Sequence, residues 1–169
     1  MTGSFLIEAL GPGHDKTSFS SGVAPLDRYL REQASQDMRR RASACYVALE
    51  APGSKIAGYY TLAAAGVLLA DLPESLGKRL PRHPSVPVAR LGRLAVDQAY
   101  QGRKLGGALL WDAGIRASRS EIAVFALLVD AKDERAESFY LHHGFVPLGN
   151  RSGQPRLILP ITTFSKGSV

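Results

Sequence analysis

The feature that most constrains the fold is a strand, a glycine-rich turn, a helix and a second strand that follow one another directly. Residues 88–97 (VARLGRLAVD) have the pattern of a strand, and residues 105–118 (LGGALLWDAGIRAS) have that of a helix. Residues 121–131 (EIAVFALLVDA) form a continuous apolar run, which is typical of a strand buried on both faces. Two strands joined through a helix pair in parallel by a right-handed crossover. The unit therefore predicts an α/β fold whose sheet contains a parallel pair.

Apolar and alternating runs on either side of this unit predict the other elements. Strands are expected at residues 4–10, 44–51, 56–69, 145–148 and 156–161, and helices at 25–41 with a break, within 71–87, and at 133–143. Gly144 follows the last of these helices, and we expect it to end that helix as its C′ residue. The prediction is a mixed sheet in a single domain over residues 1–169.

Length and composition narrow the class of protein. The chain has 169 residues and is 45% hydrophobic, which is enough for one domain with one core. No apolar run approaches the roughly 20 residues of a membrane span, and the first residues lack the features of a signal peptide. Cys45 is the one cysteine, so we expect a buried thiol, no disulfide and a cytoplasmic protein. None of the four histidines has metal-ligand spacing, so no metal is expected.

The basic residues are clustered. The formal net charge is +6 and the sequence pI is about 9.7. Residues 38–49 and 75–96 contain no acidic residue. The basic residues that we single out in these two segments are Arg39, Arg40, Arg41, Lys78, Arg79, Arg82, Arg90 and Arg93. Clustered positive charge favours an anionic partner such as a nucleic acid, a phosphorylated cofactor or an acidic protein.

The turn between the first strand and the helix reads YQGRKLGGALL (residues 100–110) and has the composition of an anion-binding loop. A helix N-terminus presents N–H groups without intrahelical partners, and glycines let the backbone approach a ligand closely. Together they can cradle a pyrophosphate, and Arg103 and Lys104 would add mobile positive charge. The spacing fits neither a P-loop nor a dinucleotide-binding fingerprint. A purely structural glycine turn is the other interpretation.

Residues 94–110 resemble motif A of the GNAT-fold N-acetyltransferases, whose loop follows the pattern Gln/Arg-x-x-Gly-x-Gly/Ala. Gln101 and Gly106 match the first and last positions of this pattern, and Lys104 replaces the middle glycine. Residues 123–148 are similar to the family's next strand and to the helix that carries its Phe-Tyr pair. The resemblance covers nearly the whole chain. It implies the GNAT fold, with a mixed, mostly antiparallel sheet, a central splayed parallel pair and helices on both faces.

The resemblance implies acetyl-CoA as the donor. The pyrophosphate of acetyl-CoA would lie on the backbone amides of the loop, and its pantetheine would lie beside the end of the strand before the loop. Backbone N–H groups at that strand end would stabilise the oxyanion of the tetrahedral intermediate. The implied cofactor-binding residues are Leu94, Ala95, Val96, Gln101, Gly102, Arg103, Lys104, Leu105, Gly106, Gly107 and Phe139. Tyr140 stands where the family places the general acid for the thiolate; the alternative is an aromatic residue at the core edge. We expect Lys104 to present its N–H from an ordinary helical conformation, because a glycine-only conformation would strain it.

The strand before the loop lacks the carboxylate that many GNAT enzymes use as a base. It carries Arg90 and Arg93, which alternation would send to opposite faces. Gly92 can host a bulge, so we predict one over residues 91–93 and expect both arginines to flank the acceptor cleft; the alternative is solvated arginines. A suitable acceptor is anionic and has a largely neutral amine. An aminoacyl ester on tRNA fits, because its α-amino group is more acidic than a free one (pKa ~7.7–8.0) and its phosphates can bind basic clusters.

Residues 19–30 (FSSGVAPLDRYL) resemble the start of the GNAT toxins of toxin–antitoxin modules. This closer resemblance implies acetylation of the α-amino group of aminoacyl-tRNA, arrest of translation, a ribbon-helix-helix antitoxin as partner, and a homodimer. The basic residues named above would then bind tRNA. The alternatives are a ribosomal or other protein N-acetyltransferase, a non-catalytic acetyl-CoA-binding or DNA-binding module, and a small-molecule acetyltransferase. The toxin-like segment argues against a ribosomal or other protein N-acetyltransferase. Tyr140 argues against a non-catalytic module, and the lack of acid-lined acceptor loops argues against a small-molecule acetyltransferase.

Overall fold

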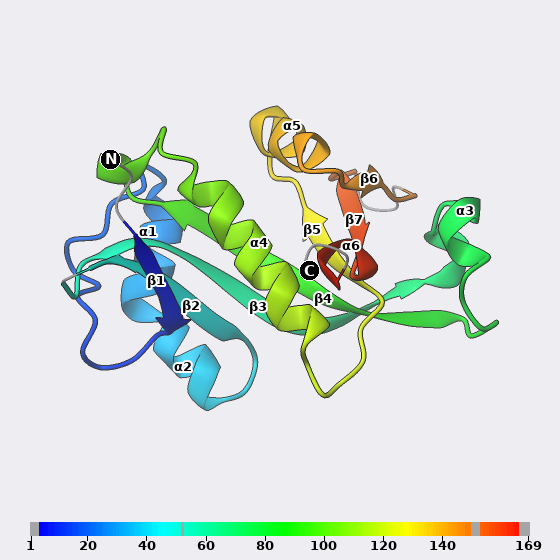
Figure 1. The fold of residues 1–169 in the computed structure, drawn as a ribbon, viewed down its shortest axis with the longest axis horizontal. Coiled ribbons are helices and arrows are strands. Elements are labelled where there is room, and N and C mark those ends of the chain that lie inside the picture. The colour runs from blue at the N-terminus through cyan, green and yellow to red at the C-terminus, as the bar shows by residue number, and fades with distance from the viewer. Residues whose placement is uncertain (1–3, 52, 150–152, 166–169) are drawn as a thin grey trace. The chain divides into compact units, whose positions relative to one another are not determined.

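The structure is a computed structural model that describes residues 4–51, 53–149 and 153–165. Its strands form a seven-stranded sheet in the order β1-β2-β3-β4-β5-β7-β6 across the described residues (Figure 1). In chain order the elements are β1 (Phe5–Ala9), α1 (Ala24–Glu32), α2 (Ala34–Arg39), β2 (Ala44–Glu50), β3 (Ile56–Leu68), the 3₁₀ helix η1 (Leu69–Asp71), α3 (Glu74–Gly77), β4 (Ser85–Val96), the 3₁₀ helix η2 (Gln98–Tyr100), α4 (Leu105–Ser118), β5 (Ala126–Asp130), α5 (Glu134–His142), β6 (Val146–Pro147), β7 (Arg156–Pro160) and α6 (Thr162–Ser165). β4 and β5 are parallel, and the sheet is otherwise mostly antiparallel. The predicted α/β fold class is confirmed.

The elements follow the predicted order, and α4 has the predicted bounds. β5 is shorter than predicted because the apolar run before it is not buried: Ile122 is 77% exposed, and the strand begins at Ala126. β4 begins at Ser85, three residues earlier than predicted at 88, and Val86 and Val88 continue the alternation of its buried face. The sequence pattern did not indicate α6. None of the helices within the described ranges is long and apolar enough to cross a membrane.

The contacts divide the chain into two compact units. The first consists of Met1–Ala63 and Leu91–Ala113, and the second of Ala64–Arg90 and Gly114–Val169. β3, β4 and α4 therefore each contribute residues to both units. The single domain over residues 1–169 stays a prediction, and residues 1–3, 52, 150–152 and 166–169 of that range lie outside the described residues.

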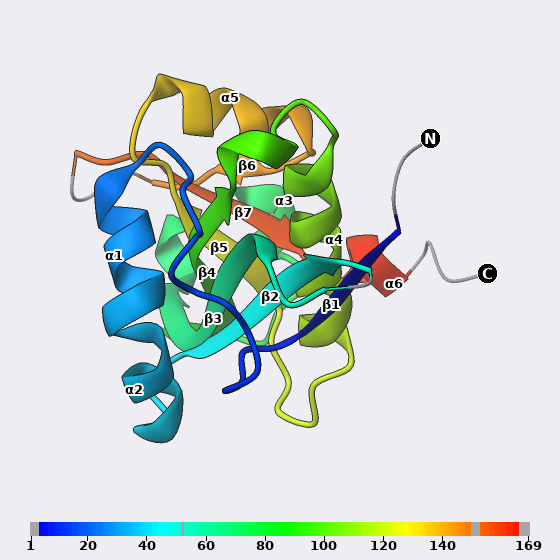
Figure 2. The ribbon, with the colours of Figure 1, turned by 90° about the vertical axis from the view of Figure 1, so that its left-hand side faces the viewer.

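In the first unit, strand alternation on β3 sends two adjacent tyrosines to two different helices. Tyr59 donates a hydrogen bond to the Leu26 carbonyl of α1 at 2.7 Å, and Tyr60 donates one to Asp112 of α4 at 2.5 Å. Both rings are fully buried. Figure 2 shows α1 and α2 on one side of β2 and β3 and α4 on the other. Helices therefore cover both faces of the sheet in this unit, as predicted.

In the second unit, β5 pairs with β4 on one side and β7 on the other. The pairs are Ala89↔Leu127 and Arg90↔Leu128 with β4, and β7 runs antiparallel along the whole strand. The four residues Ala126–Val129 are buried, as expected for a strand covered on both faces. The Asp133 side chain caps α5 by accepting a bond from the Ala136 N–H, and Gly144 has φ = 93°, which confirms it as the residue that ends this helix.

Gly58 lets the first turns of α4 pack directly on β3. A Cβ atom at this position would lie 2.9 Å from Leu109 Cδ1 and 3.0 Å from the Ala95 carbonyl oxygen, which belongs to the backbone and cannot rotate away. We expect Gly58→Ala to lower the free energy of unfolding by about 1–3 kcal/mol through overpacking. Urea denaturation followed by circular dichroism measures this. The matched control is Gly13→Ala, which meets nothing within 4 Å; equal stabilities of the two variants would contradict the packing argument.

Candidate functional site

The predicted anion cradle lies between β4 and α4 in the first unit. Asp97 caps η2 by accepting a hydrogen bond from the Ala99 N–H at 2.9 Å. The loop then runs through Gly102, with φ = 82°, to Lys104, whose carbonyl accepts the first bond of α4 from the Ala108 N–H. The first N–H groups of α4 therefore start immediately after Lys104, where they have no partners within the helix.

Lys104 has φ = 63°, which lies in the left-handed region. The expectation of an ordinary helical conformation for this residue is therefore wrong. The loop keeps the conformation that glycine favours, although the residue carries a side chain. A non-glycine residue in this region is strained by about 1–2 kcal/mol, because its Cβ crowds the following carbonyl oxygen.

Several hydrogen bonds fasten the cradle loop to the segment before α1. The Ser20 N–H donates to the Asp97 carboxylate at 3.0 Å, and the Gln98 N–H donates to the Ser20 carbonyl at 2.8 Å. The Gln101 side chain donates from Nε2 to the carbonyls of Ser21 and Val96, both at 3.0 Å. Gln101 thus holds the loop with its side chain, and its backbone is what remains for a ligand.

The segment that resembles the toxin start is itself braced from inside the unit. Ser21 donates to the buried Asp27 carboxylate from its N–H at 2.9 Å and from its hydroxyl at 2.6 Å. Phe19 is 2% exposed and packs edge-on against Tyr59. Sequence reasoning used these residues as marks of a family and did not assign them a role; the signal available was the acid at position 27 on an otherwise apolar helix face.

Arg103 is held in place by neighbouring side chains. Its Nη1 lies 3.5 Å from Glu50 Oε2, and its guanidinium carbon lies 5.2 Å from the Tyr100 ring centre and 5.5 Å from that of Phe5. These contacts give the Arg103 guanidinium defined neighbours, and the expectation of mobile charge stays a prediction. Its charge still lies next to the cradle, where the helix dipole also favours an anion.

The end of β4 carries the residues predicted to contact the pantetheine, Leu94, Ala95 and Val96. Ala95 is buried in the first unit's core. Beside them, the guanidinium carbon of Arg93 lies over the Tyr29 ring, 3.5 Å from the ring centre. The Tyr29 hydroxyl donates to Asp37 at 2.7 Å, and burial, with this bond adding to it, raises the pKa of Tyr29 to about 12. Tyr29 is thus a neutral, fixed platform for Arg93.

Arg90 lies in the second unit, in a group that sequence reasoning missed. Its Nε is 3.5 Å from Asp130 Oδ2, and Arg156 Nε is 3.6 Å from Asp130 Oδ1. We call these three residues the Arg90–Asp130–Arg156 cluster. A pairing between strands far apart in sequence leaves no local signal. The predicted bulge over residues 91–93 stays a prediction.

Tyr140 and Phe139, the predicted general acid and its neighbour, lie on α5 of the second unit. Tyr140 is 8% exposed, and its ring packs against Phe139 and Phe145 with centres 5.2 and 5.3 Å apart. Burial raises the pKa of Tyr140 to about 12. The phenol is therefore fully protonated at neutral pH, which is the state that a proton donor needs.

The other predicted RNA-binding residues are exposed. Arg39, Arg40 and Arg41 end α2, where Arg41 has φ = 56° and the Ala42 N–H donates back to the Asp37 carbonyl. This is a Schellman ending with arginine in the usual glycine position. In the second unit, Lys78 Nζ lies 3.8 Å from Glu74 Oε1, and Arg79 donates a hydrogen bond to the Thr162 hydroxyl. Arg82 follows α3 and is exposed.

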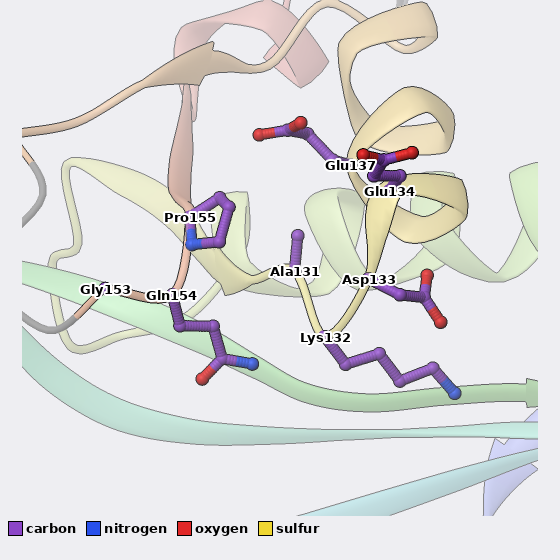
Figure 3. A pocket seen from close by; sticks show the side chains of 8 residues that line it. All are labelled: Ala131, Lys132, Asp133, Glu134, Glu137, Gly153, Gln154 and Pro155. Carbon is purple, nitrogen blue, oxygen red and sulfur yellow. The ribbon is translucent and has the colours of Figure 1, made fainter.

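A cavity of about 420 Å³ lies in the second unit between the start of α5 and the segment before β7 (Figure 3). No predicted site residue lines it. Its charged side chains include Lys132, Asp133 and Glu137, which point in different directions. They do not converge on one ligand position.

The comparisons with known proteins agree with these features. A family model described as acetyltransferase (GNAT) domain matches residues 41–147. A tRNA-acetylating toxin of Mycobacterium tuberculosis (strain ATCC 25618 / H37Rv) is 38% identical over 147 residues, 86% of this chain and 86% of that protein. The structure of AtaT complexed with acetyl-methionyl-tRNAfMet is similar with a TM-score of 0.82 and 27% identity, over 96% of this chain and 98% of that chain. The crystal structure of AtaTR bound with AcCoA has a TM-score of 0.82 and 26% identity, over 96% of both chains.

The strain at Lys104 gives a test of the cradle geometry. We expect Lys104→Gly to raise the free energy of unfolding by about 1 kcal/mol, because glycine adopts the left-handed region without a Cβ penalty. Lys104→Ala is the matched control, since it removes the charge but keeps the Cβ. Urea denaturation separates the two variants. A gain in stability of the same size from both would mean that the charge, and not the backbone conformation, is the source of strain.

Proposed function

This chain belongs to the GNAT acetyltransferases and is an N-acetyltransferase, and from this premise we propose that it is a toxin that transfers the acetyl group of acetyl-CoA to the α-amino group of aminoacyl-tRNA. Acetylation of that amine would block translation. The proposal rests on the tRNA-acetylating relative, on the two similar complexes, and on the arrangement of the residues described above.

The cradle supports acetyl-CoA as the donor. The N–H groups at the start of α4, the glycines and the adjacent Arg103 and Lys104 form a positive site with the chemistry that a pyrophosphate requires. The residues that would hold the cofactor are Leu94, Ala95, Val96, Gln101, Gly102, Arg103, Lys104, Leu105, Gly106, Gly107 and Phe139. The AtaTR complex with AcCoA supports the same assignment by similarity.

The segment Phe19–Leu30 is the observation that carries the toxin proposal over a generic acetyltransferase. In this chain it is hydrogen-bonded to the cradle loop at Asp97, Gln98 and Gln101. The residues that mark the resemblance to the toxins therefore shape the donor site directly. A ribosomal-protein N-acetyltransferase, the second candidate, has no comparable observation in its favour.

The reaction needs few protein groups. The neutral α-amine attacks the thioester carbonyl, the N–C bond forms, and backbone N–H groups at the end of β4 stabilise the oxyanion. The C–S bond then breaks, the thiolate leaves with the electron pair, and Tyr140 gives it a proton. The attacking nitrogen releases one proton to solvent, and solvent returns one proton to the Tyr140 phenolate, so the protons balance. Amine nitrogens of aminoacyl esters are largely neutral near pH 8, which suits a site without a carboxylate base on β4.

The partners in this proposal are aminoacyl-tRNA and a cognate ribbon-helix-helix antitoxin, and the toxin acts as a homodimer in the cytoplasm, where charged tRNA is found. The exposed basic residues would bind tRNA phosphates. They are Arg39, Arg40, Arg41, Lys78, Arg79 and Arg82, and Arg90 and Arg93 would flank the acceptor. Each phosphate neutralised adds to the salt dependence of binding.

Incubation with labelled acetyl-CoA and charged total tRNA tests the proposed function. We expect label in the RNA fraction that is lost when the ester bond is hydrolysed at alkaline pH, and an N-acetylated amino acid among the products. Uncharged tRNA is the control and should take up no label. Label in ribosomal or other protein, with none in RNA, would favour the second candidate.

The role of Tyr140 has its own test. We expect Tyr140→Phe to reduce turnover by about 10²–10⁴-fold, the usual contribution of a general acid, while calorimetry shows unchanged acetyl-CoA binding. Because the pKa of Tyr140 is raised to about 12, the wild-type rate should not fall between pH 9 and 10 through loss of this proton. Phe145→Leu is a packing control against the same ring. Turnover of Tyr140→Phe close to that of the wild type would refute the assignment.

A further inference from the structure

Asp130, at the carboxyl end of β5, is flanked by arginines from the two neighbouring strands. The ion pairs join the Nε atoms of Arg90 and Arg156 to the two carboxylate oxygens, at 3.5 and 3.6 Å. Within the part of the chain that the structure describes, neither guanidinium has another hydrogen-bond or ion-pair partner. The terminal nitrogens of both arginines therefore remain for a ligand.

Strand pairing places the three side chains on one face of the sheet. Asp130 is directly opposite Arg156, and Arg90 pairs with Leu128, two residues before Asp130. Paired residues share a face, and so do residues two apart on one strand. The same face continues away from the cluster as an apolar core, formed in part by Val86, Val88, Ala126, Leu128 and Ile158.

Stability accounts for only part of the cluster. The side chains of Arg90 and Asp130 are 54% and 30% exposed, and an ion pair this exposed contributes little to folding, whereas the Arg156 side chain is 19% exposed. The distances are also longer than those of charge-assisted hydrogen bonds, which are about 2.7–2.9 Å. Two arginines beside one aspartate leave one positive charge in excess. The arrangement is that of an anion site whose two cations are kept together by a carboxylate.

On the basis of the proposed function, we infer that the Arg90–Asp130–Arg156 cluster binds a phosphate near the 3′ end of the aminoacyl-tRNA acceptor. In this inference Arg156 binds the phosphate together with Arg90. Guanidinium groups suit this role because their fork of N–H donors matches phosphate oxygens. Asp130 is a positioning residue, which offsets the repulsion between the two arginines before the phosphate arrives.

The position of the cluster in the second unit gives the phosphate contact a consequence for catalysis. Asp130 ends β5, and the chain then passes through Ala131–Asp133 into α5, which carries Tyr140. A phosphate held on β4, β5 and β7 would orient the 3′ end with respect to the helix that bears the proton donor. Loss of the contact should therefore weaken acceptor binding and leave donor binding unchanged.

Steady-state kinetics of charged tRNA at saturating acetyl-CoA test the inference on Arg156→Gln and Arg90→Gln. We expect each to raise the KM for charged tRNA about tenfold and to reduce the salt dependence of kcat/KM by about one phosphate contact. The KM for acetyl-CoA should not change. Arg119→Gln, an exposed arginine after α4 with no role proposed above, is the matched control.

Two further variants separate positioning from structure. Arg156→Lys keeps the charge and should recover part of the loss seen in Arg156→Gln. Asp130→Asn should raise the KM for charged tRNA with little change in kcat, and its effect should largely disappear in the Arg156→Gln background because the two act together. Circular dichroism of each variant checks folding, and Arg90→Gln, at a more exposed position, repeats the test if Arg156→Gln does not fold.

The outcomes that would overturn the inference are distinct from failure of the proposed function. A KM for charged tRNA in Arg156→Gln and Arg90→Gln equal to that of Arg119→Gln would remove the phosphate site while acetyl transfer by the wild type continues. A large fall in kcat and an altered pH profile in Asp130→Asn, with unchanged KM, would make Asp130 a proton acceptor instead. If the wild type transfers no acetyl group to charged tRNA, the proposed function fails, and the inference fails with it.

Discussion

The buried carboxylate of Asp97 is the interaction on which the donor side of the site depends. It accepts one hydrogen bond from the Ala99 N–H, which caps η2. It accepts a second from the N–H of Ser20, which lies 77 residues before Asp97 in the chain. A buried carboxylate without such donors is costly to remove from water. The cradle loop and the segment before α1 therefore stabilise each other's observed conformation. The direction in which the chain enters α4, and with it the direction of the helix N–H groups, follows from this contact.

The basic residues of the two units differ in how they can meet an anion. Arg103 is held by Glu50 and Tyr100, Arg93 by the Tyr29 ring, and Arg90 by Asp130. These arginines are oriented before a ligand binds, so less side-chain entropy is lost when it does. The arginines at the end of α2 and around α3 form a second, exposed group. They suit non-specific attraction of a polyanion, and the held arginines suit recognition at fixed points.

The sequence predicted the elements well where burial and periodicity agree, and poorly where they do not. The bounds of α4 follow from its apolar residues and the glycines before it, whereas Ile122 extended the predicted β5 into residues that are exposed. The cradle residues Gln101–Gly107 are contiguous, so their grouping was predictable. The Asp130 contacts with Arg90 and Arg156 depend on strand pairing, which has no local signature. The fold of the Phe19–Gly22 segment onto Asp97 was hidden for the same reason, although its residues were recognised as a motif.

Lys104, just before α4, has its backbone in the left-handed region. Its left-handed conformation costs about 1–2 kcal/mol relative to a residue without a Cβ, and a glycine at this position would remove that cost. What lysine adds over glycine is an alkyl stem and an ammonium group at the start of α4. Among the described residues no ion pair of this ammonium is found that would recover the cost within the free protein. An anion bound at the start of α4, as proposed for the pyrophosphate, would make a charge contact with this ammonium that offsets part of the cost.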